Sequence, residues 1–322
     1  MVFLAFTQHF SLPLTNPVLI FSLILFIILF APLLLNRLNI PHLIGLIIAG
    51  NLMNRDSSII LFGTVGLLYI MFLAGLEIDM EEFLKNKWKS IYFGLLTFSI
   101  PMFLGTYGAL YVLGYRQSSA ILLASMFASH TLLAYPIISK MGLARNKIVG
   151  IAIGGTMITD TLALMVLAII VGVSHGTVDA TFWWRLGISF TIATIIILIG
   201  FPILARWFLK KYSDNISQYI FILALVFLGG FMAELAGLEA IIGAFMAGLS
   251  LNKLIPRTSS LMNRIEFVGN ALFIPFFLIG VGMLINVAAF FNDWETIKVA
   301  AFMVSVALAA KYLAAWITQK TL

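Results

Sequence analysis

Residues 147–172 read KIVGIAIGGTMITDTLALMVLAIIVG, an apolar run with one acidic residue, Asp160, at its midpoint. A helix needs roughly 20 mainly apolar residues to cross the hydrocarbon core of a bilayer, so this run predicts a membrane-spanning helix. A carboxylate halfway along such a helix costs a few kcal/mol unless it faces protein or water and has a partner. Asp160 is therefore a candidate ion-binding residue. The alternative is a structural carboxylate that is hydrogen-bonded to a neighbouring helix.

The composition extends this prediction to the whole chain. Of the 322 residues, 62% are hydrophobic and only 10% are charged, and the mean hydropathy is +1.09. These values predict an all-α polytopic membrane protein with a single transmembrane domain over residues 1–322. The net charge of +6 does not indicate nucleic-acid binding, because the basic residues lie in short loops between apolar runs. With no cysteine, no phosphate-binding glycine loop and no nucleophile–base spacing, we expect neither a cofactor nor an enzyme.

Apolar runs of spanning length predict about eleven helices. They are Pro17–Asn36, Ile40–Met53, Ser58–Leu76, Trp88–Leu113, Ser118–Met141, Lys147–Gly172, Trp183–Leu209, Ser217–Phe231, Ala233–Leu251, Ile265–Ile285 and Trp294–Thr318. The second and the eighth of these segments are short. Short segments at matching places in two halves are typical of inverted repeats, with the seventh segment linking the two halves.

The basic residues predict the orientation of these helices. Alternating loops place fourteen lysines and arginines on one side of the membrane and four on the other. The larger group is Arg37, Lys85, Lys87, Lys89, Lys140, Arg145, Lys147, Arg206, Lys210, Lys211, Lys253, Arg257, Arg264 and Lys320, and the smaller is Arg55, Arg116, Arg185 and Lys298. Because cytoplasmic loops are enriched in basic residues, the N-terminus is predicted outside and the C-terminus inside.

The fifth segment contains a predicted helix break. It reads ASHTLLAYP over residues 128–136, and Pro136 removes a backbone donor in mid-segment. In transporters, unwound mid-membrane backbone supplies carbonyls to an ion site, and Ser129 and Thr131 would add hydroxyl oxygens. A simple proline kink is the alternative. His130 could carry protons in a vestibule, or it could be a hydrogen-bonded structural residue.

Three further charges lie near or within the predicted spans. Lys311 lies about two turns from the end of the last apolar run. It could snorkel to the interface, or it could pair with a buried acid such as Asp160 and compete with an arriving cation. Glu239 could line an entry funnel from the outer side. Glu77 is the acid of its loop closest to the membrane, and it could serve an inner vestibule.

Three stretches carry a resemblance to a known family. They are FLAGLEID at residues 72–79, GLEAIIGAFMAGL at 237–249 and FIPFFLIGVGM at 273–283. Together with Asp160 opposite the predicted break, they resemble the monovalent cation:proton antiporter superfamily, in particular its Kef-like and NapA-like bacterial branch. The likeness covers most of the chain.

The resemblance implies an inverted-repeat fold of thirteen helices in a homodimer. Residues 17–76 and 217–285 would then be mainly dimerisation scaffold, residues 88–172 and 294–318 the ion-translocating core, and residues 183–209 the linker helix. Two broken helices would cross in that core, which slides between the two faces of the membrane like an elevator. Lys311 matches the lysine that pairs with an acid at the site in some members.

This sequence departs from the pattern of the family at three places. Thr159-Asp160 stands where electrogenic members carry two adjacent acids, so we expect electroneutral one-for-one exchange. Glu239 replaces a residue that is commonly serine. The second broken helix and the final helix of the family are expected to be missing after Leu322.

The combined interpretation is a secondary antiporter in the inner membrane of a bacterium. It would exchange Na⁺ or K⁺ for H⁺, with Asp160 holding either the metal ion or the proton. Thr159, Ser129 and Thr131 would complete the oxygen shell of the cation. The alternative is a cation channel or a membrane sensor on the same scaffold.

Overall fold

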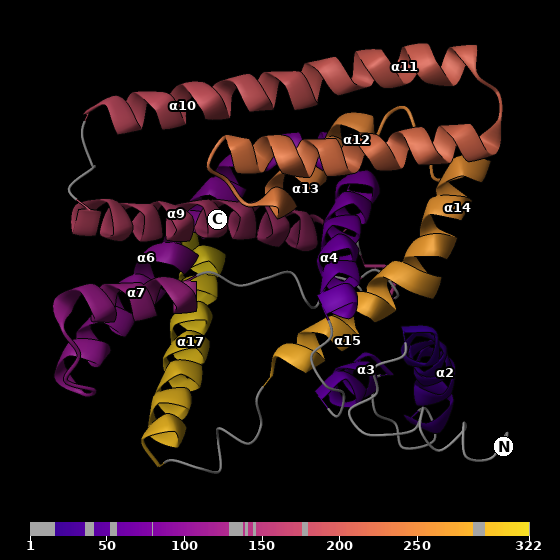
Figure 1. The fold of residues 1–322 in the computed structure, drawn as a ribbon. Helices are drawn as coiled ribbons and strands as arrows, with labels where there is room; N and C mark the ends of the chain where they lie inside the picture. Colours follow the sequence, from indigo (N-terminus) through magenta and orange to yellow (C-terminus); the bar gives the residue numbers. More distant parts are fainter. Residues whose placement is uncertain are drawn as a thin grey trace, which may run out of the picture. The chain divides into compact units, whose positions relative to one another are not determined.

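The computed structural model describes residues 17–35, 42–51, 57–78, 80–128, 138, 141–143, 146–175, 180–285 and 294–321. Within these ranges the chain forms helices and turns and no strand (Figure 1). Its long helices are α2 (Pro17–Leu35), α4 (Ser57–Glu77), α6 (Lys87–Tyr111), α9 (Lys147–His175), α10 (Ala180–Ile195), α12 (Asn215–Leu235) and α17 (Trp294–Thr321). The shorter ones are α3 (His42–Asn51), α5 (Met80–Lys85), α7 (Gln117–Ala128), α11 (Phe201–Lys211), α13 (Ala240–Leu251), α14 (Ser260–Val268) and α15 (Ile274–Leu284).

Seven helical stretches of the described chain are long and apolar enough to cross a membrane. They are Ile59–Glu77, Lys87–Tyr111, Lys147–Leu167, Gly187–Lys211, Asn215–Leu235, Ser260–Leu284 and Trp294–Thr321, and three shorter apolar helices accompany them. The prediction of an all-α polytopic membrane protein is confirmed. The total of eleven spans stays a prediction.

Two of the long spans contain a turn of π-helix just before a proline. The π-turns are η2 (Ile196–Gly200), between α10 and α11, and η3 (Gly269–Phe273), between α14 and α15. In η2 the N–H of Phe201 donates to the carbonyl of Ile196, five residues back, and Pro202 follows directly. Proline lacks an N–H and crowds the preceding turn, so the wider π-turn lets the helix continue past it. Figure 1 shows α10 and α11 as one continuous rod.

The described residues divide into two compact units, with α4 passing from one to the other after Leu67. The first unit holds α2, α3, the start of α4, η3 and α15. Its helices approach closely at glycines: a Cβ on Gly50 would overlap the carbonyl of Ile279, and a Cβ on Gly282 would overlap that of Ile47. Small residues at membrane helix interfaces permit this kind of backbone contact.

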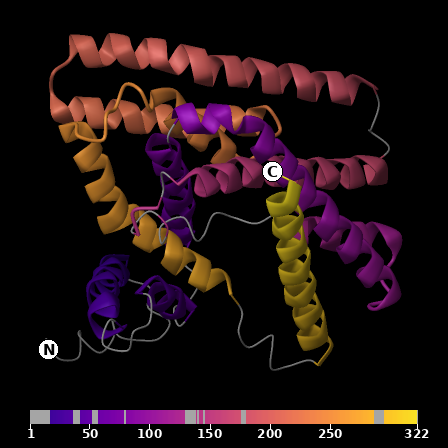
Figure 2. The same cartoon turned by 180° about the vertical axis from the view of Figure 1, so that it is seen from behind.

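In the second unit, α6 is the helix on which α7, α9 and α17 pack. A different glycine of α6 allows the close approach of each neighbour. Gly94 contacts α9, Gly105 contacts α7, and Gly108 contacts the ring of Phe302 on α17. Figure 2 shows α17 beside α6 from behind. The arrangement brings the two long helices that carry Asp160 and Lys311 onto one support.

The C-terminal end of α4 packs against α13 and the segment that follows it. The amide Nδ2 of Asn252, just after α13, donates to the carbonyls of Leu76 at 2.6 Å and Ile78 at 2.9 Å. Arg257 donates to the carbonyl of Glu77. These bonds satisfy carbonyls that a helix end leaves without a partner, and so they fix the end of α4 against the segment after α13.

The ninth predicted segment is wrong at its start. Helix α12 continues to Leu235, and α13 begins only at Ala240. The intervening turn contains Gly237 at φ 82°, a left-handed conformation that ends a helix at little cost for glycine. Because α12 has 21 residues, the prediction that the eighth segment is short is also wrong, and its match with the short α3 no longer supports an inverted repeat.

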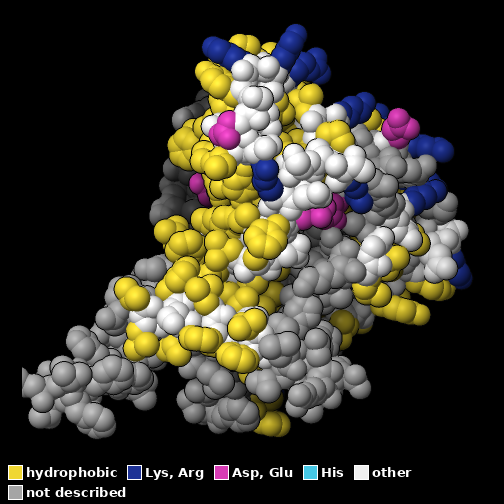
Figure 3. Space-filling view, turned by 90° about the vertical axis from the view of Figure 1, so that its right-hand side faces the viewer, with side chains coloured by type: hydrophobic (Ala, Val, Ile, Leu, Met, Phe, Trp, Pro, Cys, Tyr) yellow, Lys and Arg dark blue, Asp and Glu magenta, His cyan; other side chains and the backbone are white. Residues whose placement is uncertain are grey.

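Basic side chains gather where α11 ends. Arg206, Lys210 and Lys211 are exposed there, and Figure 3 shows a cluster of Lys and Arg at the top of the view above a mainly hydrophobic surface. Lys211 lies over the ring of Trp207 at 5.2 Å. Aromatic and basic side chains at helix ends are typical of a membrane–water interface.

Candidate functional site

Asp160 lies near the middle of α9, which has 29 residues. Its side chain is only 8% exposed, and that of its neighbour Thr159 is completely buried. The hydroxyl of Thr159 donates to the carbonyl of Thr156 at 2.7 Å. Since a hydroxyl that donates keeps its lone pairs, Thr159 can still accept a hydrogen bond or coordinate a cation through its oxygen.

Helix α9 crosses α6 shortly before Asp160. A Cβ on Gly94 of α6 would lie 2.9 Å from the carbonyl oxygen of Gly155 and 2.9 Å from Cβ of Ile158 on α9. The two backbones are therefore in direct contact about one turn before Asp160. This contact holds the part of α9 just before Asp160 against α6.

Two buried threonines accompany this crossing, and sequence reasoning missed both. Thr156 lies four residues before Asp160 on α9, and Thr97 lies three residues after Gly94 on α6; each is 2% exposed. Thr156 donates to the carbonyl of Ala152 at 2.9 Å, and Thr97 donates to that of Phe93 at 2.8 Å. The i, i+4 spacing places Thr156 on the Asp160 face of α9, and this signal was visible in the sequence.

Lys311 comes from α17, between the fully buried Ala310 and Ala314. Its Nζ is shielded from solvent and has no hydrogen-bond partner among the described residues. Lys311 interacts electrostatically with Asp160. A direct contact between these two site residues stays a prediction.

The predicted helix break lies outside the described residues. Ser129, His130, Thr131 and Pro136 all belong to residues 129–137, just after α7. Their predicted roles in the oxygen shell, in proton transfer and in the break stay predictions.

The two other predicted acids lie at opposite ends of α13. Glu239 directly precedes α13, where burial raises the pKa of its carboxyl. Glu77 ends α4, next to the segment after α13, and is 8% exposed. Twelve residues of helix separate these ends by roughly 18 Å. The two acids therefore belong to different surroundings, and their vestibule roles stay predictions.

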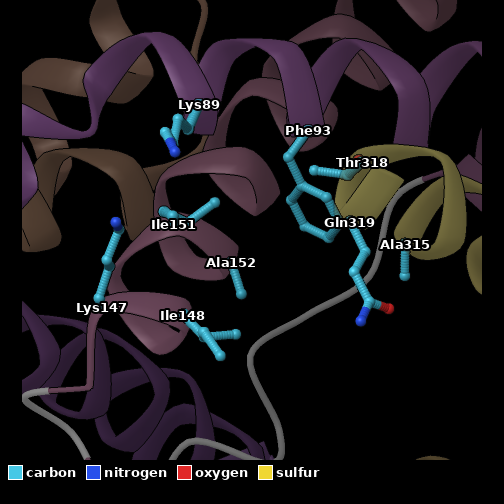
Figure 4. Close-up of a pocket in the computed structure, with 9 residues that line it drawn as sticks. All are labelled: Lys89, Phe93, Lys147, Ile148, Ile151, Ala152, Ala315, Thr318 and Gln319. Atoms are coloured by element: carbon cyan, nitrogen blue, oxygen red, sulfur yellow. The ribbon is translucent and has the colours of Figure 1, made fainter. Parts of the chain in front are cut away.

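A cavity of about 550 Å³ opens between the first turns of α6 and α9 and the last turns of α17. Figure 4 shows Lys89 and Lys147 together on one side of it and Gln319 on the opposite side. Ala152 lines the cavity and lies eight residues, or roughly 12 Å, before Asp160 on the same face of α9. Sequence reasoning missed this cavity, because it depends on how three helices pack.

This arrangement can hold a monovalent cation or a proton at one carboxylate. Low exposure makes an uncompensated charge on Asp160 costly, so a bound proton, a metal ion or the Lys311 ammonium would each stabilise the site. The threonine hydroxyls can serve as neutral oxygen ligands. Within the described ranges no group of three or more His, Cys, Asp or Glu side chains is placed to bind a metal.

Comparison with known proteins identifies the relatives of the chain. It is 38% identical over 317 residues to the Na⁺/H⁺ antiporter NhaS5 of Synechocystis, covering 94% of this chain and 45% of that protein. It is 27% identical over 321 residues to probable Na⁺/H⁺ antiporter 3 of Methanocaldococcus jannaschii, covering 94% of this chain and 80% of that protein. A third relative, the Na⁺/H⁺-K⁺ antiporter GerN of Bacillus cereus, is 27% identical over 260 residues, with 79% of this chain and 66% of GerN covered.

The chain spans less than half the length of NhaS5. A family model for the transmembrane part of sodium/hydrogen exchangers matches residues 24–322, which include every described helix from α3 onward. The resemblance carried by residues 72–79, 237–249 and 273–283 is thereby confirmed, and the chain belongs to the sodium/hydrogen exchanger family.

Proposed function

We propose that this chain exchanges Na⁺ or K⁺ for H⁺ across a membrane and that Asp160 binds both substrates in turn. The observation that carries the proposal is a single acid, 8% exposed, in the middle of an apolar spanning helix. Membership of the sodium/hydrogen exchanger family supports it, as do the names of the relatives, which are Na⁺/H⁺ antiporters.

Coupling follows from competition at one carboxylate. A protonated Asp160 has no charge to attract a cation, and a cation bound to Asp160 excludes the proton. If the site opens to one side at a time, each cation that leaves is replaced by a proton, and the reverse holds on the other side. One carboxylate without a second adjacent acid favours one-for-one, electroneutral exchange.

Lys311 would act as the internal counterion of the empty site. When neither ion is bound, its ammonium compensates the charge of Asp160, as their electrostatic interaction suggests. An arriving cation must displace this interaction, and a proton removes the need for it. Thr159, together with Thr156 and Thr97, would supply neutral oxygens near the carboxylate. Ser129 and Thr131 are proposed as further ligands.

Several finer features belong to the same proposal. They are an elevator-type motion of a core formed by residues 88–172 and 294–318, a homodimer built on the scaffold of residues 17–76 and 217–285, and a place in the inner membrane of a bacterium. The choice between Na⁺ and K⁺ depends on the size of the oxygen shell, so the transport assay includes both ions.

The decisive experiment compares Asp160→Asn with the parent chain in proteoliposomes that contain an internal pH dye. Under an imposed Na⁺ or K⁺ gradient, we expect the parent to move protons and Asp160→Asn to show no more proton movement than protein-free liposomes. The substitution removes the charge and keeps the size of the side chain, so the fold should survive. Size-exclusion chromatography in detergent checks this.

Asp214→Asn is the matched control. Asp214 is an exposed N-cap whose carboxylate accepts a hydrogen bond from the backbone N–H of Ser217 at 2.9 Å. Because asparagine is an equally good N-cap, this variant should exchange ions like the parent. Cation-driven proton movement that persists in Asp160→Asn would remove Asp160 from the mechanism. A cation current without coupled protons in the parent would indicate a channel instead.

A further inference from the structure

The cavity between α6, α9 and α17 has the size and lining of a ligand site. Its volume of about 550 Å³ lies within the range of roughly 300–1,000 Å³ that small-molecule pockets occupy. Phe93, Ile151 and Ala152 supply apolar walls, while Thr318 and Gln319 add polar groups at one side. A mainly apolar pocket with a few polar groups at its edge suits a molecule with an apolar body and a polar end.

The charges at the cavity are all positive among the described residues that line it. Lys89 and Lys147 lie in the first turns of α6 and α9, and Figure 4 shows their amine ends directed toward one another. Neither helix has an acidic residue in its first turn. Since a helix N-terminus already carries positive partial charge, two lysines at two such ends concentrate positive potential at the cavity.

We propose that this cavity binds an anionic phospholipid, with the headgroup phosphate between Lys89 and Lys147 and an acyl chain along the apolar walls. Charge complementarity favours an anion, and the apolar lining favours a lipid over a small soluble anion. The last turns of α17 close the cavity on a third side, through Ala315 and Thr318. The lysines here are therefore part of a pocket, in addition to following the positive-inside rule.

One consequence rests on the proposed function. The cavity lies roughly 12 Å from Asp160 along α9, on the side predicted to face the cytoplasm. Lys89 and Lys147 would repel a cation that approaches Asp160 from that side. A bound headgroup phosphate would offset this repulsion, so anionic lipid would favour cation entry. The binding itself does not require transport.

The chain contains no cysteine, so a single introduced cysteine can report on the cavity. Ala315→Cys is labelled with an environment-sensitive nitrobenzoxadiazole dye, and the full chain is reconstituted in phosphatidylcholine vesicles that contain doxyl-labelled phosphatidylglycerol or doxyl-labelled phosphatidylcholine. We expect stronger quenching by phosphatidylglycerol. The preference should fall about fivefold for each lysine removed in Lys89→Gln and Lys147→Gln.

Two matched controls distinguish lipid binding in the cavity from lipid contact with the rest of the protein surface. Leu313→Cys lies on the same helix and is 41% exposed, but it does not line the cavity, so both lipids should quench its dye equally. Lys210→Gln with Lys211→Gln removes the same charge from the end of α11 and should leave the Ala315→Cys signal unchanged.

Three results would overturn the proposal. The first is equal quenching of the Ala315→Cys dye by both lipids, and the second is a preference that survives the removal of Lys89 and Lys147. The third is displacement of the labelled phosphatidylglycerol by soluble glycerophosphate, which would indicate a site for small anions. Because the readout is binding, each result stands whether or not Asp160→Asn abolishes exchange.

Discussion

The amine of Lys311 on α17 is shielded from solvent, and the fully buried Ala310 and Ala314 lie close to it on the same helix. A buried ammonium is costly unless an opposite charge compensates it, and the charge that acts on it here is that of Asp160. Snorkelling to the interface, the alternative interpretation of the sequence, would instead place the amine in water. The shielded amine therefore favours a role inside the protein.

Replacing Lys311 by methionine should change the pH dependence of exchange. The variant keeps the length of the side chain and removes the positive charge that favours the ionised form of Asp160. We expect the pH of half-maximal exchange to move upward by about one pH unit. Initial rates of cation-driven proton movement in proteoliposomes, measured between about pH 6 and pH 9, test this expectation.

Lys298→Met provides the control on the same helix. Lys298 is exposed and pairs with Glu295 at 2.6 Å, three residues away. Exposed pairs of this kind contribute little, so the pH profile of this variant should match that of the parent. A Lys311→Met profile that superimposes on the parent profile would contradict a charge-coupling role.

The functional importance of a single residue was predictable from the sequence where that residue interrupts an apolar run. Asp160 and Lys311 are charges inside apolar runs, and their cost in a membrane makes them visible without a structure. Thr97 and Thr156 are ordinary residues in such runs, and only the packing of α6 on α9 distinguishes them. The cavity beside Lys89 and Lys147 was hidden for the same reason.

At the scale of elements, glycines decide which helices meet. On α6, Gly94, Gly105 and Gly108 each admit a different neighbour to the helix backbone. Apolar periodicity cannot predict this, because in a lipid environment all faces of a spanning helix are apolar. The sequence therefore predicted that α6, α9 and α17 exist, but not the choice of α6 as the common support.

Gly94→Ala should destabilise the crossing of α6 and α9. The new Cβ would lie 2.9 Å from the carbonyl oxygen of Gly155, and a backbone atom cannot rotate out of the way. We expect a loss of about 1–3 kcal/mol in the free energy of unfolding, which is typical of overpacking. Thermal unfolding of the purified chain in detergent measures it as a lower midpoint.

Gly150→Ala on α9 is the matched control for Gly94→Ala. No atom lies within 4 Å of a Cβ built there, so the substitution meets open space. Alanine is the better helix former by about 1 kcal/mol, so this variant should unfold at the same temperature as the parent or at a higher one. Equal destabilisation by both substitutions would show that the crossing of α6 and α9 is not tightly packed.

The boundaries of the elements were less predictable than their existence. The sequence placed Glu234 at the start of a helix, whereas it lies in the last turn of α12, and α13 begins only after the turn at Gly237. A glycine inside an apolar run can either continue a helix or end it, and the flanking residues do not decide between these outcomes. In the folded chain Gly237 has a positive φ angle, and α12 ends just before it.

At the scale of the whole molecule, the asymmetry of basic residues predicts how the chain lies in the membrane. The exposed basic cluster at the end of α11 contrasts with the far end of α12, whose last turn carries the exposed Glu234. The 21 residues of α12 span roughly 32 Å, enough to cross the hydrocarbon core. The ends of α12 should therefore lie on opposite sides of the membrane, with the basic end in the cytoplasm.

Single cysteines at the two ends test this orientation in a chain that has no cysteine of its own. With a membrane-impermeant maleimide on intact cells, we expect Glu234→Cys to be labelled at once and Lys210→Cys only after the membrane is permeabilised. Both side chains are exposed, so a difference in labelling reports the side of the membrane rather than burial. The reverse pattern would contradict the positive-inside prediction and would move the cavity beside Lys89 and Lys147 to the outer face. Labelling of both cysteines in intact cells would mean that α12 does not span the membrane.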